Sequence, residues 1–335
     1  MSCFLRRLFA SLVLAWGLVP AWGLVLAWGL VPSPSHAADK IVVLTALESL
    51  YSITSSLAQS TSIEVRSVPA NLPGFSQVPR TFTRLSAQAG RDLAQADAVI
   101  SLRSLWPEDP LYREARARNI RVVEIDAGRS LAKGSPSVMV ITQPLTQVPW
   151  RTAAAAPSSK ASPYAWFSPS NGIRMADLIA RDLKRLAPQE AERIDANLKT
   201  FSAQVQALRA EFEARILALE DRRVFALSDH FVYLTNEFGI EVSGSFLEED
   251  VLWTQADRDG FIAMVKAQGI KTILHHWLPS SEVEATIGQS GGRLLVLDDG
   301  ENSIGDGAPD KPDSQAYLKV LRAALEDLVR ALGGQ

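Results

Sequence analysis

The chain contains four histidines, and two of them offer the first sign of chemistry. His275 and His276 are adjacent and follow an apolar run that is typical of a strand. Neutral imidazole is a common metal ligand. Neighbouring residues at a strand end point in opposite directions, so only one of the two can face a site. A hydrogen-bonded histidine pair on a loop, without a metal, is the alternative interpretation.

Ser228, Asp229 and His230 have the residue types of a hydrolytic triad without its layout. A triad brings its members together from separate segments, whereas these three are consecutive. The chain also lacks a Gly-x-Ser-x-Gly elbow, a P-loop and a glycine-rich dinucleotide fingerprint. We therefore expect no enzyme, and a hydrolase is the most distant alternative.

Acidic residues gather among Gly, Pro and Ser between Asp298 and Asp313. A calcium loop needs alternating Asp or Asn ligands, then a glycine and a distal glutamate, and this run does not have that register. The sequence predicts a solvated loop here.

The composition is that of a globular protein with enough chain for two modest domains. The 335 residues are 47% hydrophobic and 21% charged, with a formal net charge of -3. Nucleic acid is not expected as the main partner, because phosphate binding requires a basic surface. Cys3 is the single cysteine, so an intrachain disulfide is excluded.

The N-terminus has the three parts of a secretory signal. Arg6 and Arg7 precede an apolar run at residues 8–32, and small residues at 35–38 form an exit that a signal peptidase recognises. We predict a signal peptide over residues 1–37 and a mature protein in the periplasm. A retained membrane anchor is the alternative, because the run is long enough to span a bilayer.

Strands and helices alternate in the first part of the predicted mature chain. Predicted strands at 41–46, 63–68, 98–102 and 121–125 are separated by predicted helices at 47–59, 87–96 and 110–118. Residues 131–163 are rich in Ser, Pro and Ala and are expected to form a surface loop. An amphipathic helix is predicted at 171–186.

A long helix is predicted next, from Pro188 to Leu219, because its apolar residues recur every three or four positions. Roughly thirty helical residues span roughly 45 Å, which suits a rigid link between two lobes. The alternation then restarts, with predicted strands at 224–227, 240–242, 272–274 and 293–297 and predicted helices at 231–238, 257–268, 281–289 and 315–332. We therefore expect an α/β fold with two parallel sheets flanked by helices. The expected N-terminal lobe is 38–187, the linking helix 188–220 and the C-terminal lobe 221–335.

Four strings within this layout resemble the metal-binding solute-binding proteins of zinc, manganese and iron ABC importers. The most specific string, at 162–171, resembles Asp-Pro-His-x-Trp-Leu-Asp-Pro-x-Asn and retains both prolines, the tryptophan and the asparagine. Residues 79–82 resemble Pro-His-x-Tyr/Phe, residues 228–233 resemble His-Asp-x-Phe-x-Tyr, and the closing helix from Tyr317 is the fourth. The resemblance covers residues 40–332 and implies a ligand cleft between two lobes.

The resemblance also implies which residues face the ligand. The three histidines of the metal-transporting pattern are replaced here by Arg80, Tyr164 and Ser228. His230 lies two residues past its ligand position and ranks lower.

The remaining ligand positions of the related proteins are acidic. One aligns near His275 and His276, of which His276 is the better match, and a further acid falls on Asp298 or Asp299. A plain zinc or manganese carrier would use His276, Asp298 and water.

Arg80 changes the expected cargo. A guanidinium has five donors and no acceptor, so it cannot bind a metal ion and instead favours carboxylate, hydroxamate or phosphate oxygens. Tyr164 and Ser228 would add hydroxyl groups. The expected ligand is therefore a small anionic metal complex, such as a ferric siderophore. The ordinary alternatives are a surface ion pair for Arg80 and a core position for Tyr164.

The resemblance implies a monomeric carrier that delivers its cargo to an ABC permease with its ATPase. No resident cofactor is expected beyond a bound zinc, manganese or iron ion or its chelate. A non-transport envelope adhesin or accessory protein on the same fold is the alternative from another class.

The signal segment makes a direct prediction. We expect the exported protein to begin at Ala38 or Asp39, which N-terminal sequencing of periplasmic protein would measure. A product that begins at Met1, or that stays with the membrane fraction, would contradict it.

Overall fold

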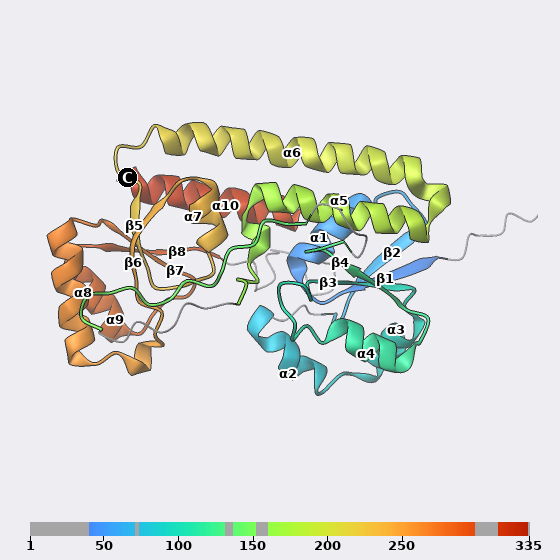
Figure 1. Ribbon diagram of the computed structural model, residues 1–335, viewed down its shortest axis with the longest axis horizontal. Coiled ribbons are helices and arrows are strands. Elements are labelled where there is room, and N and C mark those ends of the chain that lie inside the picture. Colours follow the sequence, from blue (N-terminus) through green and yellow to red (C-terminus); the bar gives the residue numbers. More distant parts are fainter. Residues whose placement is uncertain (1–39, 71–73, 131–136, 152–159, 299–313, 334–335) are drawn as a thin grey trace, which may run out of the picture. The chain divides into compact units, whose positions relative to one another are not determined.

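The computed structural model describes residues 40–70, 74–130, 137–151, 160–298 and 314–333. Figure 1 shows two parallel sheets with helices around them. The strands are β1 (Ile41–Thr45), β2 (Ile63–Ser67), β3 (Ala98–Ser101), β4 (Val123–Asp126), β5 (Arg223–Ala226), β6 (Glu241–Ser245), β7 (Thr272–His275) and β8 (Arg293–Val296). The longer helices are α1 (Glu48–Leu57), α3 (Ala87–Gln95), α4 (Leu111–Arg118), α5 (Pro169–Leu186), α6 (Ala191–Leu217), α8 (Gln255–Gln268), α9 (Ser281–Ser290) and α10 (Ala316–Leu332).

The first sheet has the strand order β2-β1-β3-β4, and all its pairs are parallel. Its central strands are buried on both faces, with Val43, Leu44 and Ile100 fully inaccessible to solvent. This explains why the strands appear in the sequence as continuous apolar runs. We call this sheet and its helices the N-terminal lobe.

The second sheet repeats the pattern in the order β6-β5-β7-β8. On one face, Phe225 and Ile273 pack with α8 and α9 in a separate apolar cluster. On the other face, Val224, Leu274 and Leu295 join the core that is shared with the N-terminal lobe. We call this sheet and its helices the C-terminal lobe.

Helix α6 is 27 residues long and buries one stripe of apolar side chains. It packs against α1, α5 and α10, so it contacts helices of both lobes (Figure 1). The predicted helix at 188–219 is therefore in the right place, although residues 188–190 form a 3-10 turn instead.

The sequence predicted the fold class correctly: the chain has two parallel four-stranded sheets flanked by helices. The short helices α2 (Val78–Phe82) and η1 (Phe75–Gln77) were not predicted, because three to five residues are too few to show a periodicity. Within the described residues, no helix is long and apolar enough to cross a membrane. The predicted signal segment at 1–37 and the acidic loop at 299–313 lie outside the described residues.

Residues 137–151, which we call the strap, run from the N-terminal lobe to the C-terminal lobe. At its start the side chain of Asn171 accepts the N–H of Met139 (2.7 Å) and donates to its carbonyl (3.0 Å). Further along, Gln147 forms an antiparallel bridge with Ser245 of β6, whose hydroxyl donates to the Leu145 carbonyl. The expected surface loop is thus irregular in this part but fixed, and it covers the edge strand of the second sheet.

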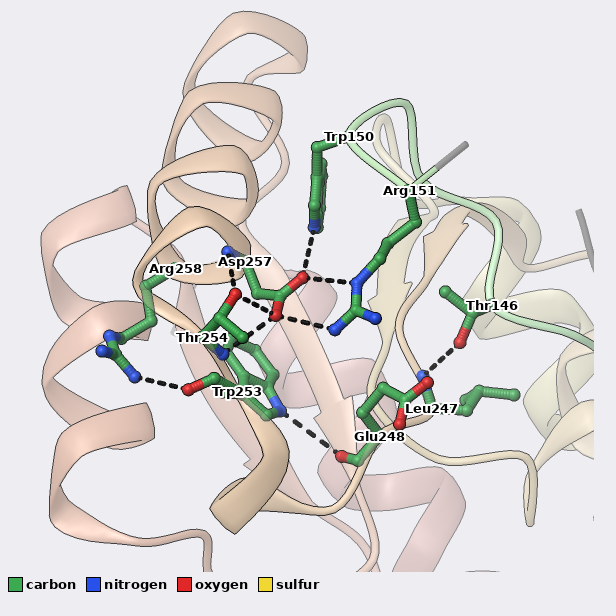
Figure 2. Close-up of polar contacts among 9 residues, drawn as sticks. All are labelled: Thr146, Trp150, Arg151, Leu247, Glu248, Trp253, Thr254, Asp257 and Arg258. Atoms are coloured by element: carbon green, nitrogen blue, oxygen red, sulfur yellow. Dashed lines mark hydrogen bonds and ion pairs between the residues drawn. The ribbon is translucent and has the colours of Figure 1, made fainter. Parts of the chain in front are cut away.

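Asp257 fastens the far end of the strap to the N-terminus of α8 (Figure 2). Its carboxylate accepts two hydrogen bonds from Arg151, at 2.7 and 2.8 Å, and one from the indole of Trp150. The same carboxylate accepts from the backbone N–H and the hydroxyl of Thr254, completing a capping box. Hydrogen bonding to Arg151, then to Thr254, holds the pKa of Asp257 well below its usual range against the opposing effect of burial.

We expect Asp257→Asn to lower the free energy of unfolding by about 2 kcal/mol, because the substitution removes a cap and a charge-assisted pair. Urea unfolding at neutral pH would measure this. Since the pKa of Asp257 is lowered in the folded state, its stabilisation is present above about pH 4 and is lost as the pH falls further. The difference between the variant and the wild type should therefore shrink in acid.

Asp259→Asn is the matched control, because the Asp259 carboxylate lies on the same helix and, among the described residues, accepts a single exposed hydrogen bond, from Gln255. It should change the free energy by less than about 0.5 kcal/mol. Equal losses from the two substitutions would contradict the role assigned to Asp257.

Candidate functional site

A cavity of 370 Å³ opens at the carboxyl edge of the second sheet. Its walls come from the segments that follow β5, β6 and β7, with Ser76 and Gln77 of η1 from the N-terminal lobe. The direction of the chain connections reverses between β5 and β7, which is where ligands bind in open parallel sheets. The C-terminal lobe contributes Leu227, Ser228, Asp229, His230, Leu247, Glu248, Glu249, His276 and Trp277 to the wall.

His230 connects this wall to the N-terminal lobe. It is buried, and its Nε2 lies 2.7 Å from the hydroxyl oxygen of Tyr164. The two rings are also stacked, with centroids 3.9 Å apart. The His230 ring also packs against His276, in a tilted arrangement with centroids 3.6 Å apart. The His230 ring therefore contacts both Tyr164 and His276, and we call these three rings the stack.

Ser228 shapes the turn that brings His230 into this stack. Its hydroxyl oxygen accepts the backbone N–H of His230 at 3.2 Å, and the residue is buried. A hydroxyl that accepts an N–H two residues ahead stabilises a tight turn after a strand. Ser228 therefore both lines the cavity and positions the imidazole.

The two adjacent histidines have different environments. His275 is buried at the end of β7, and its Nδ1 accepts the backbone N–H of His276 at 2.9 Å. Burial lowers the pKa of His275 to about 4. The structure places His276, and not His275, in the cavity wall.

The His276 imidazole has the properties of a metal ligand. Its Nδ1 is buried, and no hydrogen-bond partner for it occurs among the described residues. Burial, then the neighbouring His230 and His275, lower its pKa far below the ordinary value. A neutral imidazole with an unsatisfied nitrogen is the form that binds metal ions.

The charges around the cavity are negative. Asp229, Glu248 and Glu249 are among its lining residues, and the lining set contains no lysine or arginine. The Oδ1 atom of Asp229 is 3.9 Å from Nε2 of His230. In the part of the chain that is described, no three His, Cys, Asp or Glu side chains are already gathered as a metal site. These charges favour the binding of a cation. A third ligating side chain would have to move towards the two imidazoles to complete a metal site.

Of the described residues expected at the site, Ser228 and His276 line this cavity, whereas Arg80, Tyr164, His275 and Asp298 do not. Arg80 lies on α2 with an exposed side chain and is absent from the lining. Asp298 follows β8 in an exposed position and is likewise absent from it. Asp299 lies outside the described residues. Tyr164 lies beside the cavity through its contact with Nε2 of His230.

The cavity lining also contains His230, which the sequence ranks lower, and Glu248 and Glu249, which the sequence does not single out. His230 was ranked lower because it follows the aligned position by two residues, but the turn at Ser228 brings it forward. Glu248 and Glu249 follow β6 at the same sheet edge as Ser228 and His276. Their position after a predicted parallel strand is the sequence feature that could have indicated them as candidate site residues.

Tyr164 is held over the C-terminal lobe by contacts on both sides of it in the chain. The Tyr233 hydroxyl donates to the Ser162 carbonyl at 3.0 Å. The hydroxyls of Ser168 and Ser170 each donate to Glu237 on α7 (Val232–Glu237) at 2.6 Å. These bonds fix the segment that carries Tyr164 to the lobe that carries His230.

Comparison with known proteins gives concordant results. The family described as zinc-uptake complex component A, periplasmic (ZnuA), matches residues 43–331. The high-affinity zinc uptake system protein ZnuA of Brucella abortus is 30% identical over 80 residues, which are 24% of this chain and 24% of that protein. The iron-binding protein YfeA of Yersinia pestis is 24% identical over 209 residues, which are 60% of this chain and 64% of that protein. The chain thus spans about a quarter of the first relative and under two thirds of the second.

A solved structure supports the fold over a longer range. The solute-binding protein FpvC of Pseudomonas aeruginosa in complex with Mn2+ has a TM-score of 0.66 at 23% sequence identity. The match covers 88% of this chain and 99% of that one. At this identity the likeness shows the fold.

Trp277 should report occupancy of the cavity. The residue is 42% exposed, and its ring centroid lies 4.0 Å from that of His276. We expect Zn²⁺ to change the tryptophan emission of the wild type, and Trp277→Phe to remove most of that change while binding persists. Trp150→Phe is the control, because Trp150 bonds to Asp257 and does not line the cavity. A full emission change in Trp277→Phe would contradict this assignment.

Proposed function

The chain belongs to the family of the periplasmic zinc-uptake complex component A, and from that premise we propose that it carries a metal cation to an ABC importer. It acts as the solute-binding protein in the periplasm, after removal of residues 1–37. Its partners are a membrane permease and the ATPase of that permease. It works as a monomer.

One observation carries the choice of a cation: two packed imidazoles stand in a cavity whose charged lining residues are all acidic. His230 and His276 supply nitrogen donors, which suit zinc, iron and similar ions. Asp229 belongs to the same turn as His230, and its carboxylate is near enough to complete the set with a small side-chain movement. Glu248 and Glu249 attract a cation to the opening.

An anionic chelate such as a ferric siderophore is disfavoured by the same charges. That expectation depended on a cationic Arg80 beside the ligand, and Arg80 is not part of this cavity. An anion entering here would meet Asp229, Glu248 and Glu249 without a compensating lysine or arginine in the lining.

Calorimetry on the mature protein would test this proposal with Zn²⁺, Mn²⁺ and a negatively charged ferric tris-catecholate. We expect the bare ions to bind more tightly than the chelate. His230→Ala and His276→Ala should each weaken binding of the preferred ion by at least about tenfold, or about 1.4 kcal/mol.

Arg80→Ala is the control variant and should leave the affinity for each ion unchanged. If the chelate binds more tightly and Arg80→Ala abolishes its binding, the cargo is an anionic complex and the cation proposal is wrong. If neither ions nor chelate bind, the protein does not carry metal through this cavity.

A further inference from the structure

A second cavity, of 150 Å³, lies between the strap, strand β6 and helix α7. Its inner lining residues, among them Ala226, Phe231 and Leu274, are almost fully buried. At its outer end Val242 of β6 is 41% exposed, and Gln147 of the strap is exposed beside the same cavity. A small molecule can therefore enter from the edge of the second sheet.

The walls of this second cavity are apolar. None of its described lining residues carries a charge, whereas the charged residues that line the first cavity are acidic. Two of its hydroxyl groups already donate to backbone carbonyls, Thr235 to Phe231 at 3.1 Å and Ser245 to Leu145 at 2.7 Å. An ion would lose its hydration here without compensation. The second cavity therefore suits a neutral, apolar molecule.

The volume of the second cavity sets the size of that molecule. An apolar cavity of about 150 Å³ accommodates one benzene molecule. A fused ring system or a long alkyl chain would have to protrude into solvent between Val242 and Gln147. The occupant expected from the size of the cavity is thus a single ring or a short branched chain.

One turn of the chain separates the two cavities. Ser228 lines both of them, His230 lines the first and Phe231 lines the second. The Ser228 hydroxyl accepts the backbone N–H of His230, and the Phe231 ring packs edge-on against Phe167 with centroids 5.1 Å apart. A molecule in the second cavity would therefore contact residues on both sides of His230 in the chain.

We propose that the second cavity binds a small neutral apolar molecule and that this molecule strengthens metal binding at His230. The molecule fills the space next to residues 228–231, so the turn holds the imidazole in one position before an ion arrives. By reciprocity, a bound ion tightens the binding of the apolar molecule by the same factor. The apolar site stands on its own geometry, and its effect on metal rests on the proposed function of the first cavity.

The test uses benzene as the probe and the mature protein, first without added metal. We expect calorimetry to show saturable binding of benzene. Benzoate, the same ring with a negative charge, should bind at least about tenfold more weakly, because no described lining residue supplies a cation. With benzene at saturation, the affinity for Zn²⁺ should rise at least about threefold.

A pair of matched variants locates the benzene site. Val242→Trp places a larger side chain at the outer end of the second cavity and should weaken benzene binding at least about tenfold. Val296→Trp is the control, because Val296 is 38% exposed on β8, the opposite edge strand of the same sheet, and does not line this cavity. It should change benzene affinity by less than about twofold.

Ala226→Val fills the second cavity from its buried end and should act like Val242→Trp. Circular dichroism and thermal unfolding would establish that each variant is folded.

The outcomes separate this inference from the proposed function. If benzene does not bind, or binds equally well to Val242→Trp and Val296→Trp, the apolar site is overturned. If benzene binds but leaves zinc affinity unchanged or weaker, the coupling is overturned and the apolar site stands. If benzene binds and zinc does not, the proposed function and the coupling both fail, while the apolar site stands.

Discussion

Parallel pairing of β5, β6 and β7 brings three separate stretches of chain out at one edge of the second sheet, and the cavity depends on this constraint. Because the strands run in the same direction, the residue after each carboxyl end is near the residue after its neighbour. His230 and His276 are 46 positions apart in the sequence, yet their rings are in contact. The reversal of connections between β5 and β7 leaves a crevice between them that no crossover helix fills.

The N-terminal lobe completes the site through a small number of strong contacts. The Glu237 side chain, only 6% exposed, accepts hydrogen bonds from the hydroxyls of Ser168 and Ser170. It also forms an ion pair with Arg209 of α6 at 2.8 Å. Charge-assisted bonds of this kind are stronger and more directional than neutral ones. They fix the segment before α5 against α7, and Tyr164 is in that segment. These contacts fix the position of Tyr164 against His230.

The sequence contained most of the fold but only part of the site. Buried parallel strands and the stripe on α6 follow from the distribution of apolar residues, which is visible without coordinates. His276 and Tyr164 were identified through a resemblance that aligns positions along the chain. The directions of Arg80 and His230 depend on a five-residue helix and on a side-chain-stabilised turn, so the sequence could not predict them. Such local geometry leaves no periodic trace in a sequence.

The position of the strap in the chain order has a consequence for how the protein reaches its folded state. An unpaired outer strand is a template for pairing with other chains, and β6 is such a strand. The strap that shields it at Ser245 is about a hundred residues nearer the N-terminus. During synthesis from the N-terminus, the strap is therefore made before β6, the strand with which it pairs.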